Sequence, residues 1–217
     1  VIMGPEKKSR VMSKREKELT AIHEAGHAIL SLLIPEVNPV TKVSIIPRGM
    51  AGGYTLTPPK EDKGYHSKSE LLGDIAVALG GRVSEEFNFG DITTGAANDL
   101  ESATQIARKM VCDFGMSERL GNISLGKGHG PVFLGRDLIE EKNYSDETAS
   151  IIDEEVKRIV DECYQRAKKL IQENQEKLKT LANTLLEKEV LGGEEIKRML
   201  GLVTPNAPDA NPQPKQS

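Results

Sequence analysis

The chain has 217 residues, of which 37% are hydrophobic and 29% charged, an ordinary composition for one large globular domain or two small ones. Its formal net charge of −4 argues against a nucleic-acid-binding protein, because such a protein needs a clustered excess of Lys and Arg. Cys112 and Cys163 are too few for a disulfide framework and lack the C-x-x-C spacing of a zinc knuckle, so we expect reduced thiols.

The start of the chain indicates a piece of a longer protein. The first ten residues, "VIMGPEKKSR", contain neither an initiating Met nor the apolar segment of a signal peptide, and the sequence has no apolar run long enough to span a membrane. We therefore expect a soluble fragment in which residues 1–12 form a linker and residues 203–217, rich in Pro, Asn and Gln, form a disordered tail.

The first predicted helix starts at a capping box. Ser13 is followed three residues later by Glu16, and we expect the helix to run to Ile34, because Pro35 cannot continue it. Its middle reads "TAIHEAGHAILSLLI", an apolar helical pattern interrupted by two imidazoles and a carboxylate. Gly26 in this segment costs about 1 kcal/mol relative to Ala, which predicts a close approach by another backbone or by a substrate.

The spacing of His23, Glu24 and His27 points to a metal site. A lone His on a helix is usually a core residue with one hydrogen-bond partner, but this interpretation leaves the second His unexplained. Residues at i and i+4 lie on one helical face, so both imidazoles can reach one ion. His-Glu-x-x-His is the zinc peptidase motif, in which both His bind Zn²⁺ and the Glu is the general base. The sequence "HAILSLLI", which starts at His27, excludes the class with an extended His-rich motif.

The next elements are a β-hairpin and a second helix. Residues 40–59, "VTKVSIIPRGMAGGYTLTPP", alternate, are rich in β-branched residues and contain a Gly-rich bend, so they predict a hairpin or two strands of a small sheet. This is the only convincing β signal in the chain. Ser67 and Glu70 then form a second capping box, from which we expect one helix to continue to about Phe87.

A third long helix is predicted within "TTGAANDLESATQIARKMVC", with Asn98 as its N-cap and Glu101 as the reciprocal partner. Asp99 would then lie in the first turn, where the helix dipole favours a negative charge with or without a metal. Residues 115–144 are Gly-rich and weakly patterned, so we expect a long loop with at most one short strand.

Apolar residues in the last third of the chain recur at steps of three and four. The stripe runs from Ala149 to Leu170 and, with the Leu-rich segment after it, predicts a C-terminal helical bundle over residues 146–202. The last helix of the bundle is expected from Gly193 to Leu200. A coiled-coil arm is the alternative, but the stripe lasts only about three heptads, which favours packing onto the chain's own domain.

A catalytic zinc needs a third protein ligand and one open position. The two other histidines, His66 and His129, lie in segments expected to be exposed. Carboxylates are better candidates, and they are Glu85 and Glu86 at the end of the second helix, and Asp91 and Asp99 around the third. Spacing alone does not choose between Glu85 and Asp99.

Seven blocks of the sequence, in this order, resemble the FtsH family, the membrane-anchored ATP-dependent zinc proteases: "HEAGHA", "VSIIPRG", "GGRVSEE", "TTGAANDL", "MVCDFGMSERLG", "VFLGR" and "IDEEVKRIV". The resemblance covers roughly residues 1–200. It implies that His23, His27 and Asp99 bind Zn²⁺. It also implies that Glu24 is the general base and that Glu85 accepts a hydrogen bond from a ligand His, which fixes the orientation of the ring.

The same resemblance implies a mainly α fold. A helical zinc peptidase core would occupy residues 13–145, with a small β-hairpin or sheet near the active site, and the C-terminal bundle would follow. The full-length protein would be a homo-hexamer with a transmembrane segment and an ATPase module before this chain. It would degrade unfolded or membrane proteins, with the peptidase domain on the cytoplasmic side in a bacterium or the equivalent side in an organelle. No G-x-x-x-x-G-K-[ST] loop occurs, so we expect this chain to hydrolyse peptide bonds without binding ATP.

A helical oligomerisation module with a structural or silent metal site is the alternative function. A structural zinc is held by four protein ligands and needs no base, whereas the sequence offers three ligands and Glu24. We therefore expect an enzyme.

Overall fold

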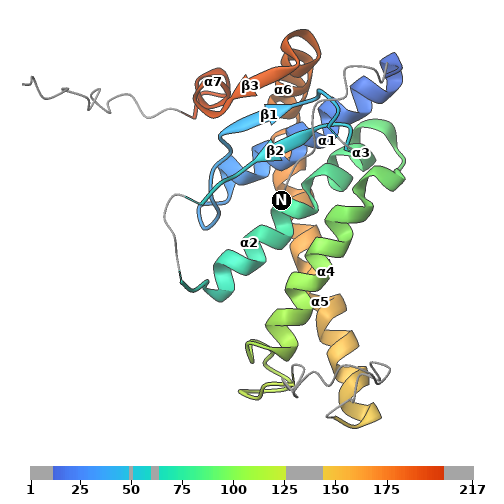
Figure 1. The fold of residues 1–217 in the computed structure, drawn as a ribbon, viewed down its shortest axis with the longest axis vertical. Helices are drawn as coiled ribbons and strands as arrows, with labels where there is room; N and C mark the ends of the chain where they lie inside the picture. The colour runs from blue at the N-terminus through green and yellow to red at the C-terminus, as the bar shows by residue number, and fades with distance from the viewer. Residues whose placement is uncertain (1–11, 49–50, 60–63, 126–143, 203–217) are drawn as a thin grey trace, which may run out of the picture.

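The computed structural model describes residues 12–48, 51–59, 64–125 and 144–202, and these are mainly helical, with a small antiparallel sheet beside the helices (Figure 1). The helices are α1 (Lys14–Leu33), α2 (Lys68–Ala78), α3 (Gly80–Phe89), α4 (Ala97–Cys112), α5 (Asp146–Glu173), α6 (Gln175–Lys188) and α7 (Gly193–Met199), with a 3-10 turn, η1 (Thr94–Ala96), before α4. The strands are β1 (Lys42–Ser44), β2 (Tyr54–Leu56) and β3 (Val190–Gly192). The predicted mainly α fold with a small sheet is confirmed.

Helix α1 is central to the fold. Its capping box is present, since the Ser13 hydroxyl accepts the amide N–H of Glu16 at 3.2 Å and the Glu16 carboxylate accepts the amide N–H of Ser13 at 2.8 Å. The chain becomes extended at Ile34 (φ −94°, ψ 109°), because the residue before a Pro is disfavoured in the helical region. α1 packs against α3 and α6 and also contacts α2, α5, β1 and β2. Side chains on α1 can therefore meet elements from every part of the described chain.

The sheet has the order β2-β1-β3, and both strand pairs are antiparallel. β1 and β2 are the two arms of the predicted hairpin, with Val43 opposite Thr55. β3 corrects the prediction that the hairpin is the only β structure, because Leu191 in β3 lies on the other side of Val43 and both side chains are buried. Only three residues long and flanked by helices, β3 takes its conformation from pairing with β1 and not from a local pattern.

The helix predicted to run unbroken from Ser67 to about Phe87 is two helices. Its capping box is present, but Leu79 separates α2 from α3. Gly80 follows, and a Cβ there would lie 2.9 Å from the carbonyl oxygen of Gly26, so the backbones of α3 and α1 are nearly in contact. The break lets α3 pack against α1, and it confirms the prediction that Gly26 permits a close backbone approach.

The prediction that Asn98 caps α4 is wrong. The hydroxyl of Thr93 instead accepts the N–H of Gly95 at 3.1 Å and caps the 3-10 turn, from which α4 continues at Ala97. The 3-10 turn thus supplies the first hydrogen bonds of the helical segment. The side chain of Asn98, which lies inside α4, is not needed for capping. Asp99 lies in the first turn of α4, as predicted.

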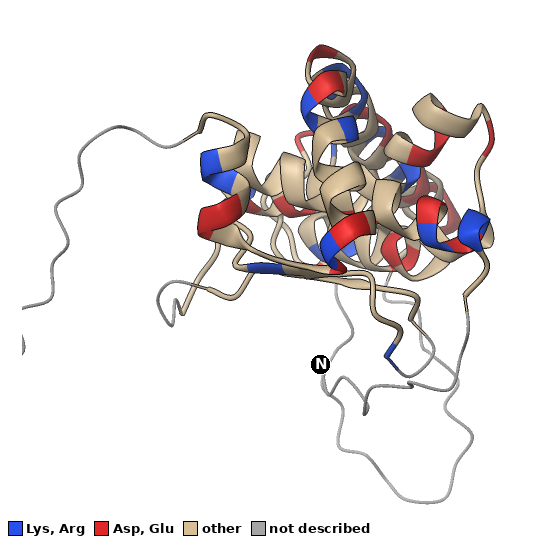
Figure 2. Ribbon diagram, turned by 90° about the horizontal axis from the view of Figure 1, so that it is seen from above, with Lys and Arg blue, Asp and Glu red and all other residues tan. Residues whose placement is uncertain are grey.

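Helices α4 and α5 form the long limb of the molecule (Figure 1). α5 also contacts α2 and α3, so it packs onto its own domain and is not a coiled-coil arm. Acidic and basic residues both occur on the helices (Figure 2), and some form ion pairs between them, such as Arg108 on α4 with Asp153 on α5 at 3.2 Å. Cys112 and Cys163 are buried free thiols, as predicted.

Some of the predicted segments fall outside the described residues. They are the linker, residues 1–12, apart from Met12; the tail, residues 203–217; and residues 126–143 of the long loop. Residues 115–125 of that loop are described and contain no strand. Within the described ranges, none of the helices combines the length and the apolar character that crossing a lipid bilayer requires.

The division into a core, residues 13–145, and a C-terminal bundle, residues 146–202, stays a prediction. α6 and β3 both belong to the second part, yet α6 packs on α1 and β3 pairs with β1. In the described residues the two parts share one hydrophobic core.

Candidate active site

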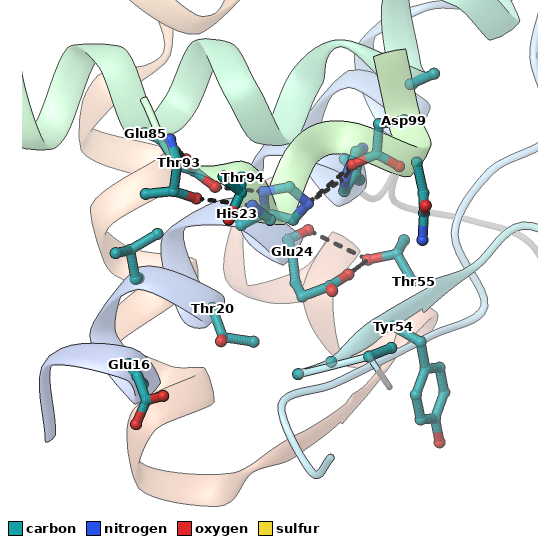
Figure 3. Close-up of a pocket in the computed structure, with 18 of the residues that line it drawn as sticks. Glu16, Thr20, His23, Glu24, Tyr54, Thr55, Glu85, Thr93, Thr94 and Asp99 are labelled. Atoms are coloured by element: carbon teal, nitrogen blue, oxygen red, sulfur yellow. Dashed lines mark hydrogen bonds and ion pairs between the residues drawn. The ribbon is translucent and has the colours of Figure 1, made fainter. Parts of the chain in front are cut away.

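Four of the side chains singled out in the sequence come together from three helices (Figure 3). His23 and His27 lie on α1, Glu85 lies on α3, and Asp99 lies on α4. Glu85 and Asp99 meet opposite edges of the His23 ring, the first at Nδ1 and the second at Nε2. The break after α2 and the 3-10 turn before α4 are therefore the local features that deliver the two carboxylates to α1.

Two ring nitrogens and one carboxylate oxygen converge on a point. Nε2 of His23 lies 3.0 Å from Nε2 of His27 and 3.1 Å from Oδ2 of Asp99, and Nε2 of His27 lies 3.5 Å from that oxygen. An ion bound tetrahedrally to N and O at roughly 2.0–2.1 Å holds its ligand atoms about 3.3 Å apart. In the described part of the chain these residues are the one group of three His, Cys, Asp or Glu with such spacing. The three atoms thus fit a small metal ion.

Each imidazole is held at Nδ1 by a different acceptor. Oε1 of Glu85 lies 2.7 Å from Nδ1 of His23, and the carbonyl oxygen of Val77 lies 2.8 Å from Nδ1 of His27. Because both acceptors require an N–H, the Nε2 atoms of two neutral rings would present lone pairs to each other at 3.0 Å. Facing lone pairs repel unless a proton or a metal cation lies between them. The donor set therefore fits a bound cation.

The charges around the rings also favour a cation. Burial alone would lower the pKa of His23, but hydrogen bonds to Asp99 and Glu85 outweigh it and raise the pKa to about 10. Burial would raise the pKa of Asp99, but hydrogen bonds from His23 and His27 hold it below its ordinary value. For Glu85, burial is likewise outweighed by the hydrogen bond from His23, and the pKa is lowered. A proton and a metal ion consequently compete for the same position.

Glu24 lies beside the converging atoms but off the helical face that carries them. The residue is 6% exposed, and its Oε2 accepts a hydrogen bond from the hydroxyl of Thr55 at 2.7 Å (Figure 3). Burial raises the pKa of Glu24, although the two imidazoles act in the opposite direction. A carboxylate with a raised pKa can take up and release a proton nearer to neutral pH, which suits a general base.

A cleft of about 680 Å³ opens over these side chains. Its lining comes from α1, from β2 and the glycines before it, and from η1 with the first turn of α4. Besides the residues named above, the lining includes Thr20, Gly53, Thr57, Thr94 and Asn98. The converging atoms of His23, His27 and Asp99, and the carboxylate of Glu24, are thus reachable from a cleft that has a sheet-edge strand as one wall.

Three contacts at the site were not predicted from the sequence. They are the hydroxyl of Thr55 on Glu24, the carbonyl of Val77 on His27, and the amide N–H of Thr93, which donates to Oε2 of Glu85 at 3.0 Å. Every residue has a backbone carbonyl, and nearly every residue has a backbone N–H. The residue type therefore gives no indication of the contacts made by the carbonyl of Val77 and the N–H of Thr93. Thr55 did leave a signal, because it is a polar residue in the middle of a predicted strand, two positions after a Gly-Gly pair.

The remaining candidate ligands lie away from the convergence point. Glu86 instead binds Lys168 on α5, with Nζ 2.9 Å from Oε1. Asp91 and His66 are exposed, and His129 falls outside the described residues.

Comparison with known proteins gives one consistent result. The sequence model of peptidase family M41 matches residues 10–199. The ATP-dependent zinc metalloprotease FtsH 1 of Thermoanaerobacter sp. (strain X514) is 55% identical over 199 residues, which cover 92% of this chain and 33% of that protein. The ATP-dependent zinc metalloprotease FtsH of Bacillus subtilis (strain 168) is 52% identical over 201 residues, covering 92% of this chain and 32% of that protein. The chain spans about one third of the length of these curated relatives.

Proposed function

The chain belongs to peptidase family M41, and from this premise we propose that it is a zinc-dependent endopeptidase domain. The observation that carries the proposal is the convergence of His23, His27 and Asp99 on one point beside the buried carboxylate of Glu24. A structural zinc would take four protein ligands and would need no base next to them. The alternative function, a helical assembly module with a structural or silent metal, fits this arrangement less well.

His23, His27 and Asp99 are the residues that would hold the ion. The relatives are named zinc metalloproteases, and two His with one carboxylate is a ligand set of catalytic zinc sites. Zinc bound there would supply the Lewis acid that polarises a peptide carbonyl and makes water nucleophilic near neutral pH. Glu85 keeps the ring of His23 in place by accepting its Nδ1–H.

Glu24 is the general base of the proposed reaction. It takes a proton from the attacking water and later delivers that proton to the nitrogen of the leaving amine, so the carboxylate ends the cycle as it began.

The cleft favours an extended polypeptide as substrate. β2 lines the cleft and pairs on one side with β1, while no strand pairs with its other side in the described residues. An unfolded segment can add to such an edge by backbone hydrogen bonds, which recognise main chain more than side chains. This mode suits a protease of unfolded or membrane proteins.

The full-length protein would contain more than this chain. The relatives are named ATP-dependent, and about two thirds of their length lies beyond the matched segment. We place there an ATPase module that feeds substrate to the cleft and a transmembrane segment that anchors the protein. The assembly would be a homo-hexamer with the peptidase domains on the cytoplasmic side, or on the equivalent side in an organelle.

Glu24→Gln tests the proposed reaction, because it keeps the size of the side chain and removes the base. We expect unchanged zinc content and a fall in casein hydrolysis of about 10²- to 10⁴-fold. Glu18→Gln, on the same helix and in contact with Lys14 at 3.9 Å, is the matched control and should keep full activity. Activity in Glu24→Gln would remove Glu24 from the mechanism, and hydrolysis by the wild type that survives zinc chelation would exclude a zinc peptidase.

A further inference from the structure

The carboxylate of Glu24 is held in place by strand β2. Within the described residues, the hydroxyl of Thr55 donates to Oε2 of Glu24 at 2.7 Å, and the same hydroxyl lies 3.3 Å from the backbone carbonyl of Glu24. A hydroxyl has one hydrogen, and the shorter contact to the charged acceptor is the stronger of the two. We propose that Thr55 is a positioning residue that fixes Glu24 for proton transfer; this inference rests on the proposed peptidase function.

The need for such a holder follows from the place of Glu24 on α1. It follows His23 directly, so it projects about 100° away from the face that carries the two imidazoles. The metal ligands therefore do not orient it. A Glu side chain has three rotatable bonds, and a proton acceptor that wanders by about 1 Å from the reacting atom can lose roughly 100-fold in rate. The hydroxyl of Thr55, a hydrogen-bond donor on the opposite wall of the cleft, restricts this motion of the Glu24 side chain.

Thr55 is itself on a rigid support. Its partner across the β1–β2 pair is Val43, which is fully buried, so the position of the strand is set by the core. Gly53 lets the chain before β2 lie close to α1, since a Cβ there would lie 2.8 Å from Cγ2 of Thr20 and 3.0 Å from Cγ of Glu24, both on α1. The distance between the hydroxyl and the carboxylate is thus fixed by backbone packing.

The geometry divides the two oxygens of the carboxylate between two roles. The hydrogen bond from Thr55 occupies Oε2, and Oε1 remains to accept the proton of the attacking water. Because β2 is also the edge along which an extended substrate would pair, one strand sets both the line of the substrate and the position of the base (Figure 3).

Thr55→Ser and Thr55→Ala form the test, because these two variants differ by a single hydroxyl oxygen, and Thr55→Val adds an isostere of the wild type. We measure kcat and KM with a casein-derived peptide, zinc content and melting temperature for each zinc-loaded variant. The expected result is a kcat about 10- to 100-fold lower in the Ala and Val variants, with KM and zinc content unchanged, and a Ser variant close to the wild type. Thr41→Ala, which removes an exposed hydroxyl from the residue before β1, controls for a general effect of hydroxyl loss on the sheet.

A crystal structure of each Thr55 variant gives a readout that does not depend on activity. In the Thr55→Ser variant we expect the Glu24 carboxylate within hydrogen-bond distance of the hydroxyl that this variant keeps, and in Thr55→Ala we expect the carboxylate to be displaced. Equal kcat values in the Ser and Ala variants, or a carboxylate that stays in place without the hydroxyl, would overturn the inference. A wild-type chain that cleaves no peptide would instead overturn the proposed function, so the two failures are distinct.

Discussion

The separate roles of the two carboxylates at the site follow from which nitrogen of His23 each one meets. Asp99 faces Nε2, the atom that also faces His27, whereas Glu85 faces Nδ1 on the other edge of the ring. Only Asp99 can therefore share an ion with both imidazoles. Glu85 acts through His23, and it is held in turn by the amide N–H of Thr93.

Asp99→Asn and Glu85→Gln separate these roles. Asp99→Asn removes the charge of the proposed third ligand, so we expect the zinc to be lost together with activity. Glu85→Gln weakens only the support of a ligand, so we expect zinc affinity to fall by about 10- to 100-fold. The measurement is zinc retention against a competing chelator, and Asp91→Asn, at an exposed position, is the control. Zinc binding that survives in Asp99→Asn but not in Glu85→Gln would make Glu85 the third ligand.

The sequence predicts the residues of the site unevenly. His23, Glu24 and His27 lie within one helical turn, so their geometry follows from the pitch of the helix. Asp99 and Glu85 come from two other helices, and the spacing of residues in the chain carries no information on which of them meets Nε2. Thr55 lies on a strand whose distance from α1 depends on packing, so the strand pattern marks it as a polar residue but does not show that its partner is Glu24.

At the scale of elements, the site depends on how closely α1 and α3 approach. A Cβ at Gly81 would lie 2.5 Å from Nδ1 and 2.6 Å from Nε2 of His23, so the imidazole of His23 rests on the backbone of α3. Gly26 and Gly80 allow the same approach one turn further along α1. Each of the three glycines costs about 1 kcal/mol in helix propensity relative to Ala. The close packing of α1 and α3 that they allow leaves the imidazole of His23 a single position.

Gly81→Ala tests this packing. The added methyl group has no room beside the imidazole, so His23 must move by about 1 Å or α3 must shift. We expect zinc affinity to fall by at least about tenfold and peptide hydrolysis by about 100-fold. Gly192→Ala is the matched control, because no atom lies within 4 Å of a Cβ at that position and its φ is −85°. Full zinc affinity in Gly81→Ala would show that the ring does not need the glycine.

Two features of the fold, the break between α2 and α3 and the strand β3, were not predicted because each depends on contacts between segments far apart in the sequence. The apolar spacing of α2 continues past Leu79 into α3, so periodicity alone predicts one helix, and the break follows from the contact of Gly80 with α1. β3 has two apolar residues between charged helices, and it is a strand because β1 offers an unpaired edge. The capping boxes at Ser13 and Ser67 were predicted correctly, since a cap is formed by residues three positions apart.

At the scale of the whole molecule, a buried carboxylate fastens the segment after α4 to α5. The side chain of Glu155 on α5 is 1% exposed and accepts the hydroxyl of Ser117 at 2.7 Å. It also accepts two hydrogen bonds from Arg158, one turn along the same helix, at 2.9 and 3.0 Å. These contacts keep the Glu155 carboxylate charged inside the fold, and they join the segment after α4 to α5.

Glu155→Gln tests what this contact contributes to stability. The hydrogen bonds from Arg158, together with that from Ser117, lower the pKa of Glu155 below its ordinary value of 4.5, despite opposing burial. A lowered pKa in the folded state contributes stability that is fully present above the unfolded-state pKa and is lost as the pH falls through the folded-state pKa. At pH 7 we therefore expect the variant to lose about 1.5–3 kcal/mol of unfolding free energy, and we expect this loss to shrink as the pH falls below 4.5, the ordinary pKa of a Glu side chain.

Urea denaturation of the zinc-free chain, followed by circular dichroism at several pH values, measures both the loss at pH 7 and its pH dependence without interference from metal release. Glu154→Gln, in the exposed ion pair with Arg119, is the control and should change stability by less than about 1 kcal/mol. A Glu155→Gln deficit that stays constant from pH 7 into the acid range would mean that the charge of Glu155 is not what stabilises the joint between α5 and the segment after α4.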